Sequence, residues 1–242
     1  NCDTPMNKVL IGIISKNRAQ ILPNAIKSAL QQGYEHKEVA VFDDCSTDST
    51  AELSKKYQHI RWILSPVPKG YVYGRNLLMS ETDAKYYCSL DDDSWFLEGN
   101  ELDIAIAYLD AHPQVAAIAF DILSPDKPNQ RAVGQPHDTN MYIGCGHVLR
   151  ISAAREMGWY YVFPGFYGGE EKDLCLSLIN AGYKIVRMPG INVWHDKTAV
   201  ARDLPKQHRS GVFNDLVFTF RRTPGLYLPG ALGIKLIKHL KF

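Results

Sequence analysis

The sequence lacks the features that mark several classes of protein. No segment reaches the roughly 18 apolar residues of a membrane-spanning helix. No basic stretch followed by a long apolar run stands at the start, so a signal peptide is not expected. The five cysteines lie far apart and form no Cys-x-x-Cys pair, and their odd number leaves one over. This pattern argues against a disulfide framework and a zinc knuckle, and it predicts a protein of the reducing cytoplasm.

A strong charge of either sign is also missing. Lysine and arginine number 27 against 26 aspartates and glutamates, and the basic residues are spread along the chain. We therefore expect no nucleic-acid partner, and any phosphate binding must be local. Of the 242 residues, 45% are hydrophobic, which is enough to form one large core. We therefore expect one domain followed by a tail.

Apolar runs typical of buried strands alternate with segments of helical periodicity. We expect strands at residues 9–14, 38–42, 60–64, 86–90, 115–120, 184–188 and 192–195, and helices at residues 21–32, 49–57, 76–82, 101–111, 148–157 and 173–181. Residues 124–140 are expected to form a long loop or irregular hairpin. The alternation predicts an α/β fold with a doubly wound, mostly parallel sheet flanked by helices, whose ligands lie beyond the carboxyl ends of the strands.

An acidic triplet is the most informative feature of the sequence. Asp91, Asp92 and Asp93 directly follow the apolar run at 86–90. Asp91 and Asp93 are two residues apart at a strand end and would project to the same side. Two such carboxylates can share Mg²⁺ or Mn²⁺, ions that often complete their coordination with substrate phosphates. A solvated acidic turn or the cap of the next helix is the simpler alternative.

Two further aspartates, Asp43 and Asp44, follow an earlier predicted strand in the same way. Either carboxylate could accept a hydrogen bond from a nucleobase. Ser46 and Asp48, a few residues on, are suited to capping the following helix. Capping explains these two residues, but it explains the paired aspartates less well, so we interpret the pair as a nucleotide contact.

Two more segments carry suitable chemistry. Arg75 ends a glycine-punctuated stretch, and its guanidinium suits a phosphate, although such stretches more often only turn the chain. Glu170, Glu171 and Asp173 follow two glycines at the start of a predicted helix. One of these carboxylates could remove the proton from an attacking hydroxyl. Acidic residues also favour helix N-termini for structural reasons.

Taken in order, these motifs resemble the family 2 glycosyltransferases of the GT-A fold. The motifs that carry the resemblance are residues 13–18, residues 42–48, Gly70, Arg75 with Asn76, residues 90–93, residues 169–174 and His195. The resemblance runs from about Lys8 to His195 and implies a metal-dependent glycosyltransferase of the hexosyltransferase type.

The resemblance assigns roles to individual residues. It implies nucleotide-sugar binding at Ser15, Asn17, Arg18, Asp43, Asp44, Ser46, Gly70, Arg75, Asn76, Asp91 and Asp92, and a Mn²⁺ or Mg²⁺ ion at Asp91, Asp93 and His195. Asp43 or Asp44 would hold the base, Arg75 would lie near the diphosphate, and Asp92 would face the ribose or the sugar. The family's Glu-Asp pair falls on Glu170 and Glu171, so Glu171 would be the catalytic base. Because a glutamate is longer than an aspartate, Glu170 or Asp173 could act instead.

The resemblance also implies a reaction. A sugar would pass with inversion from a UDP-sugar, or else a GDP- or dTDP-sugar, to a hydroxyl of a glycan, lipid-linked or small-molecule acceptor, in glycan or polysaccharide biosynthesis. Residues 1–208 would be the catalytic domain, with a nucleotide-sugar-binding half at 8–95 and an acceptor-binding and catalytic half at 96–208. The amphipathic tail at 209–242 would touch the inner face of the membrane, a partner helix or the protein's own core.

Two other classes of protein remain open. A nucleotidyltransferase acting on sugar phosphates shares the sheet topology and the metal carboxylates. It would carry a glycine-rich loop after the first strand, where residues 15–18 contain no glycine. The second alternative is a non-catalytic module that binds a nucleotide or sugar and has lost its base.

Overall fold

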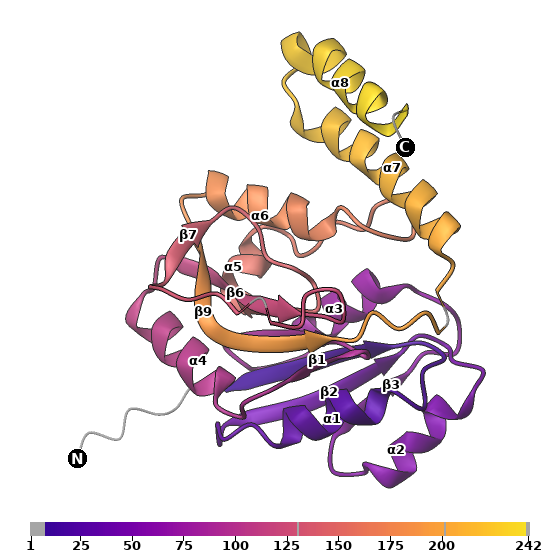
Figure 1. Ribbon diagram of the computed structural model, residues 1–242, viewed down its shortest axis with the longest axis vertical. Coiled ribbons are helices and arrows are strands. Elements are labelled where there is room, and N and C mark those ends of the chain that lie inside the picture. Colours follow the sequence, from indigo (N-terminus) through magenta and orange to yellow (C-terminus); the bar gives the residue numbers. More distant parts are fainter. Residues whose placement is uncertain (1–7, 130, 201, 241–242) are drawn as a thin grey trace.

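The computed structural model describes residues 8–129, 131–200 and 202–240. Its centre is a nine-stranded sheet with the strand order β3-β2-β1-β4-β8-β6-β9-β5, to which β7 is added at β9. The result is the mixed α/β, mostly parallel sheet flanked by helices that the sequence predicts (Figure 1). Cys2 and the last two residues of the predicted tail, 241 and 242, lie outside the described residues.

The first part of the sheet consists of parallel strands. Its strands are β1 (Val9–Ser15), β2 (Lys37–Asp43), β3 (Arg61–Leu64) and β4 (Tyr86–Asp91). Ser15 at the end of β1 is the partner of Asp43 on β2, and Ile14 is the partner of Asp91 on β4. This register brings the carboxyl ends of three strands to one edge of the sheet, where ligands bind in such folds.

The second part of the sheet is mixed. Its strands are β5 (Ser94–Phe96), β6 (Val115–Leu123), β7 (His137–Thr139), β8 (Gly146–Arg150) and β9 (Lys184–His195). Strand β8 runs antiparallel between β4 and β6, whereas β6 and β9 are parallel. Strands β5 and β7 pair with β9 in the antiparallel sense. Strand β8 therefore joins the two parts into one sheet.

Helices cover both faces of the sheet, which is why β1 is buried along its whole length. One face carries α1 (Leu22–Leu30), α2 (Leu53–Lys56, after the 3₁₀ turn Ser49–Glu52) and α4 (Glu101–Ala111). The other carries α3 (Tyr71–Ser80), α5 (Ile151–Glu156) and α6 (Glu170–Asn180). The four cysteines in the described part of the chain are free thiols.

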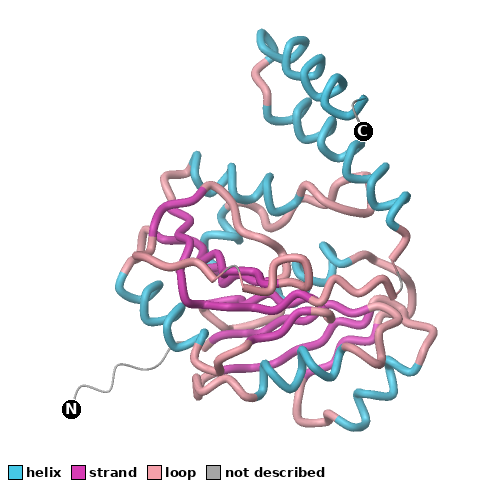
Figure 2. Tube along the Cα trace, viewed as in Figure 1, coloured by secondary structure: helices cyan, strands magenta, loops and turns pink. Residues whose placement is uncertain are grey.

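The chain ends in a helical hairpin that projects from the α/β body (Figures 1 and 2). It consists of α7 (Leu204–Arg222), the 3₁₀ turn Gly225–Tyr227 and α8 (Leu228–Leu240), and we refer to it as the C-terminal hairpin. The predicted start of the tail at residue 209 falls inside α7. Among the described residues, no helix combines the length and hydropathy that crossing a membrane would require.

The structure corrects several element predictions. The helix predicted at 148–157 is wrong at its start, because residues 148–150 belong to β8 and only α5 is helical. Val148 pairs with Cys88 on one side and Ile118 on the other, and this central place in the sheet overrides the helical periodicity. Residues 184–188 and 192–195 form one strand, β9. The loop at 124–140 contains β7.

Helix α3 begins at Tyr71, five residues before its predicted start. Gly74 explains the difference. A Cβ atom at this position would lie 2.6 Å from the Phe42 ring, so glycine lets the helix approach β2 closely. In the sequence, the same glycine had suggested a loop.

Candidate active site

A cavity of about 1280 Å³ opens at the carboxyl ends of the parallel strands. It brings together eleven of the predicted site residues, which are Ser15, Arg18, Asp44, Gly70, Arg75, Asp91, Asp92, Asp93, Glu170, Glu171 and His195. The cavity begins beside β1 and β2 and extends past α6 to the C-terminal hairpin. One continuous space therefore joins the predicted nucleotide residues to the predicted base.

Three predicted nucleotide residues stand behind the cavity wall. Ser46 donates its hydroxyl hydrogen bond to Asp43 and accepts one from the backbone N–H of Asn17 at 2.8 Å. Burial raises the pKa of Asp43. These contacts tie the loop after β1 to the loop after β2. Asn17, Asp43 and Ser46 thus position the wall, and Asp48, not Ser46, caps the following turn by accepting from Thr50 N–H.

Asn76 and Asp173 also serve as structural residues. The Asn76 side chain bonds to both backbone groups of Tyr160, at 2.8 and 3.1 Å. Asp173 accepts two hydrogen bonds of 2.6 Å from the Arg222 guanidinium, one on each carboxylate oxygen. Both oxygens of Asp173 are occupied, and neither Asn76 nor Asp173 lines the cavity. The donor contact of Asn76 and the alternative of Asp173 as base stay predictions that this placement does not favour.

Asp44 faces the donor end of the cavity. One carboxylate oxygen accepts hydrogen bonds from the backbone N–H groups of Lys69 (2.6 Å) and Gly70 (3.1 Å), and the other lies 3.4 Å from Lys16 Nζ. Gly70 has φ of +87°, a conformation that favours glycine. The loop before α3 is therefore held to the end of β2.

The three aspartates of the acidic triplet form ion pairs with arginines from different parts of the chain. Asp92 accepts a hydrogen bond of 2.6 Å from Arg18, and its burial raises its pKa to about 6. Asp93 pairs with Arg18 at 3.2 Å and with Arg202 at 2.6 Å. Asp91 instead turns to Arg75, at 2.9 Å. Arg202 was not anticipated from the sequence, because nothing in residues 196–203 points back to a strand end.

The surroundings of His195 fit a divalent cation. Its Nε2 lies 3.4 Å from Oδ1 of Asp93, a buried oxygen with no hydrogen-bond partner among the described residues. Burial opposes the ionisation of Asp93, but His195 and two arginines outweigh it and hold its pKa below the usual value. Ligand atoms of Asp91, Cys145 and His195 lie within 4.8 Å of one another. His195 thus lies close to both outer aspartates of the triplet, where a metal site is predicted. Cys145 was missed from the sequence.

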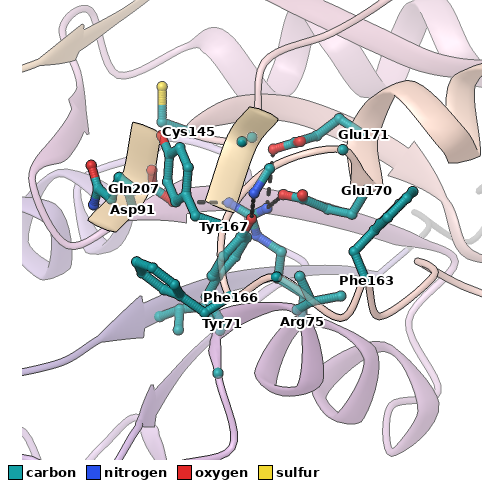
Figure 3. A pocket seen from close by; sticks show the side chains of 18 of the residues that line it. Tyr71, Arg75, Asp91, Cys145, Phe163, Phe166, Tyr167, Glu170, Glu171 and Gln207 are labelled. Atoms are coloured by element: carbon teal, nitrogen blue, oxygen red, sulfur yellow. Dashed lines mark hydrogen bonds and ion pairs between the residues drawn. The ribbon is translucent and has the colours of Figure 1, made fainter. Parts of the chain in front are cut away.

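Arg75 connects the two predicted halves of the chain. Its buried guanidinium donates to Glu170 and Glu171 at 3.3 Å each and to Asp91 at 2.9 Å (Figure 3). The ring of Tyr71 covers it at 5.0 Å. One side chain therefore links the end of β4 to the first turn of α6.

The two glutamates have different environments. Burial and the negative charge of Glu171 raise the pKa of Glu170 well above its usual value. The side chain of Glu171 is 21% exposed, against 2% for Glu170. Glu171 is therefore the more accessible of the two carboxylates.

A mostly parallel sheet with a cavity and acidic strand ends at its carboxyl edge is the arrangement of the GT-A fold. The chain belongs to glycosyl transferase family 2, whose sequence profile matches residues 10–159, more than half of its length. A Bacillus subtilis (strain 168) protein named as a teichuronic acid biosynthesis glycosyltransferase, TuaG, is 24% identical over 191 residues, or 73% of this chain and 74% of that protein.

Solved structures share the fold. TarS from S. aureus, residues 1–349 in complex with UDP, aligns with a TM-score of 0.69 and 15% identity over 97% of this chain and 72% of its own. The mannosyltransferase PcManGT from Pyrobaculum calidifontis, in complex with GDP-Man and Mn²⁺, aligns with a TM-score of 0.71 and 16% identity over 97% and 74% of the two chains. The predicted family and fold are confirmed.

Proposed function

We propose that this protein transfers a sugar from a nucleoside diphosphate sugar, with a UDP-sugar as the first candidate, to an acceptor hydroxyl. The observation that carries the proposal is the hydrogen-bonded link from Asp91 through Arg75 to Glu171 inside one cavity. The donors bound to TarS and PcManGT support a nucleotide-sugar substrate. Family membership decides against the nucleotidyltransferase alternative.

The donor end is assigned to the residues that line it. Asp44 is proposed to hold the base, Arg18 and Arg75 to face the diphosphate, and Asp92 to face the ribose or the sugar. The predicted halves at 8–95 and 96–208 keep their proposed roles in donor binding and catalysis. The name of TuaG supports a place in polysaccharide biosynthesis. Action at the inner face of the membrane, with contact through the C-terminal hairpin, stays a proposal.

Asp91, Asp93 and His195 are proposed to hold Mn²⁺ or Mg²⁺, with Cys145 beside them. A divalent cation bound there supplies positive charge to the departing nucleoside diphosphate. The Mn²⁺ in PcManGT supports this assignment. Arg18 and Arg202 already contribute positive charge at Asp93.

Glu171 is the proposed general base. It accepts the proton of the acceptor hydroxyl while the oxygen attacks the anomeric carbon, and direct displacement inverts that carbon. Arg75 orients the carboxylate, and Glu170 completes the buried pair. A non-catalytic module would need no such placement of a reachable carboxylate within the donor cavity.

Thermal unfolding with UDP, GDP and dTDP, with Mn²⁺ or with EDTA, tests the donor and the metal together. At 100 times its dissociation constant, a nucleotide is expected to stabilise the protein by about 2.7 kcal/mol. EDTA should remove most of this gain. Asp93→Asn keeps the shape of the side chain and should lose the metal-dependent part.

Asp138→Asn is the matched control, because Asp138 forms an exposed ion pair with Lys184 away from the cavity. If none of the nucleotides stabilises the protein in Mn²⁺, the donor assignment is wrong. Wild-type turnover by Asp93→Asn in a transfer assay would contradict the metal assignment.

A further inference from the structure

The cavity extends beyond Glu171 into a basic region beneath the C-terminal hairpin. Among the polar and aromatic side chains that line this end are Lys172, Asp203, Lys206, Asp215, Phe218 and His239. They come from α6, from α7 and the residue before it, and from α8, whereas the carboxyl ends of β1, β2 and β4 form the donor end. We call this set the distal end of the cavity.

Cations outnumber carboxylates at the distal end. Asp215 accepts hydrogen bonds from Lys172 at 2.8 Å and Lys235 at 2.8 Å, and His239 Nε2 lies 3.3 Å away. One carboxylate can balance only one of the two lysines. The other lining carboxylate, Asp203, accepts a hydrogen bond from the backbone N–H of Lys206 at 2.9 Å, and its negative charge offsets that of the Lys206 ammonium. With Lys235 counted, although it does not itself line the cavity, three lysines stand against two aspartates and one positive charge is left over.

Aromatic rings accompany these cations. Phe166 and Tyr167 line the cavity (Figure 3), and they are 47% and 45% exposed. Lys206 Nζ lies 4.7 Å from the centre of the Phe166 ring, and Lys172 Nζ lies 3.9 Å from that of Phe218. Apolar ring faces beside ammonium groups suit a ligand that has an apolar sugar face and a negative charge.

We propose that the distal end binds an acceptor sugar that carries a phosphate or a carboxylate near its attacking hydroxyl. Lys172 follows the proposed base Glu171 directly on the first turn of α6. The two side chains line the same cavity, with Glu171 bonded to Arg75 and Lys172 bonded to Asp215, so an anion held by Lys172 shares that space with the carboxylate that takes the proton. This inference rests on the proposed function and names the chemical class of its acceptor.

Binding of three related probes tests the inference. Glucose, glucuronic acid and glucose 1-phosphate are titrated calorimetrically into the full chain saturated with UDP and Mn²⁺, so that the donor end is filled. Glucose 1-phosphate, glucuronic acid or both should bind at least about tenfold more tightly than glucose. Whichever probe gains more identifies a phosphate or a carboxylate as the recognised group.

Lys172→Gln should reduce the charged probes to the affinity of glucose and leave UDP binding unchanged. Lys235 and His239 remain on Asp215 in this variant, so the hairpin keeps its contacts. Lys206→Gln should weaken the charged probes less. Lys184→Gln is the charge-matched control, because Lys184 pairs with Asp138 on an exposed surface.

The inference is overturned if glucose binds as tightly as both charged probes, if no probe binds, or if Lys172→Gln binds the charged probes like the wild type. In each case UDP binding still supports the proposed function. If UDP itself does not bind, the proposed function fails and the acceptor inference falls with it.

Discussion

At the scale of single residues, the site depends on how Arg75 is packed. A buried guanidinium is stabilised only if carboxylates surround it, and here Asp91, Glu170 and Glu171 do so. Gly144 closes the remaining side. A Cβ atom at Gly144 would lie 2.3 Å from Oε1 of Glu171 and 2.7 Å from Arg75 Nη2. The backbone at Gly144 therefore packs directly against the carboxylate of Glu171 and the guanidinium of Arg75.

The two glutamates should respond differently to amidation. Glu171→Gln removes the base and should lower kcat by about 10²- to 10⁴-fold with little change in donor affinity. Glu170→Gln should have a smaller effect, because an amide imitates the protonated acid that burial favours at this position. Transfer rates and UDP titrations of both variants decide the point. Equal losses in the two variants would contradict the assignment of Glu171.

Gly144→Ala should displace the Glu171 carboxylate without removing any charge. A shift of about 1 Å can cost about 10²-fold in rate, so kcat should fall while the far-UV spectrum stays unchanged. Gly230→Ala on α8 is the control, because no heavy atom lies within 4 Å of the added Cβ there. Full activity of Gly144→Ala would contradict the prediction and show that the loop before β8 moves to make room for the added methyl group.

His147 should make stability depend on pH. It stacks on Tyr142, and its ring nitrogens bond to Tyr160 and to the backbone of Ile143. Burial lowers its pKa from 6.5 to about 3. Between these values the unfolded chain binds a proton that the folded chain does not, so stability is lost as the pH falls through this window.

The lost stability should amount to at most about 1.4 kcal/mol per pH unit for this group. Urea unfolding of the wild type and of His147→Gln at pH 7 and pH 5 measures it. The glutamine of the variant is uncharged at both pH values, so the free energy of unfolding should fall less in the variant than in the wild type. Parallel losses in the two proteins would mean that His147 titrates normally.

At the scale of elements, helix α6, which carries the proposed base, is held by the C-terminal hairpin. Arg222 on α7 binds both oxygens of Asp173, whose side chain is 6% exposed. Arg222→Gln should cost about 1–3 kcal/mol in urea unfolding, because it leaves a buried carboxylate without its cation. Adding Asp173→Asn should restore part of the loss. Arg209→Gln, on the exposed side of the same helix, serves as control.

The sequence predicts the parallel half of the fold well because each strand there is a continuous apolar run that ends at an acidic or polar residue. Strand β8 is less predictable. Residues 148–150 begin a segment that the sequence predicts to be helical, and only the neighbouring β4 and β6 make them a strand. Likewise, Gly74 suggests a turn until Phe42 is seen against it.

The candidate site shows the same division. Asp44, Asp91 and Glu171 follow recognisable strand and helix ends, so their presence in one cavity is predictable. The sequence cannot distinguish Glu171 from Asp173 as candidate bases, because what differs is the contact of Asp173 with Arg222. Arg222 lies 49 residues further along the chain, so only the folded structure shows this contact. Cys145 and Arg202 carried no signal, because their roles depend on segments that meet only in the folded chain.

At the scale of the whole molecule, the two proposed halves share one sheet. The boundary at 95/96 cuts β5, which pairs with β9, and β4 pairs with β8 across it. The α/β body should therefore unfold cooperatively. Single-tryptophan variants that keep only Trp62 on β3 or only Trp194 on β9 should give the same urea midpoint by fluorescence. Two separate midpoints would mean that the halves fold independently.

The continuity of the cavity from Asp44 to the C-terminal hairpin has a consequence for inhibition. A single molecule that tethers a uridine diphosphate to a phosphorylated sugar would occupy both ends at once. Attachment of the first group raises the effective concentration of the second, so the joined compound should surpass either fragment by far more than their separate strengths suggest. The tether length that gives the tightest binding would then measure the distance between the two bound groups.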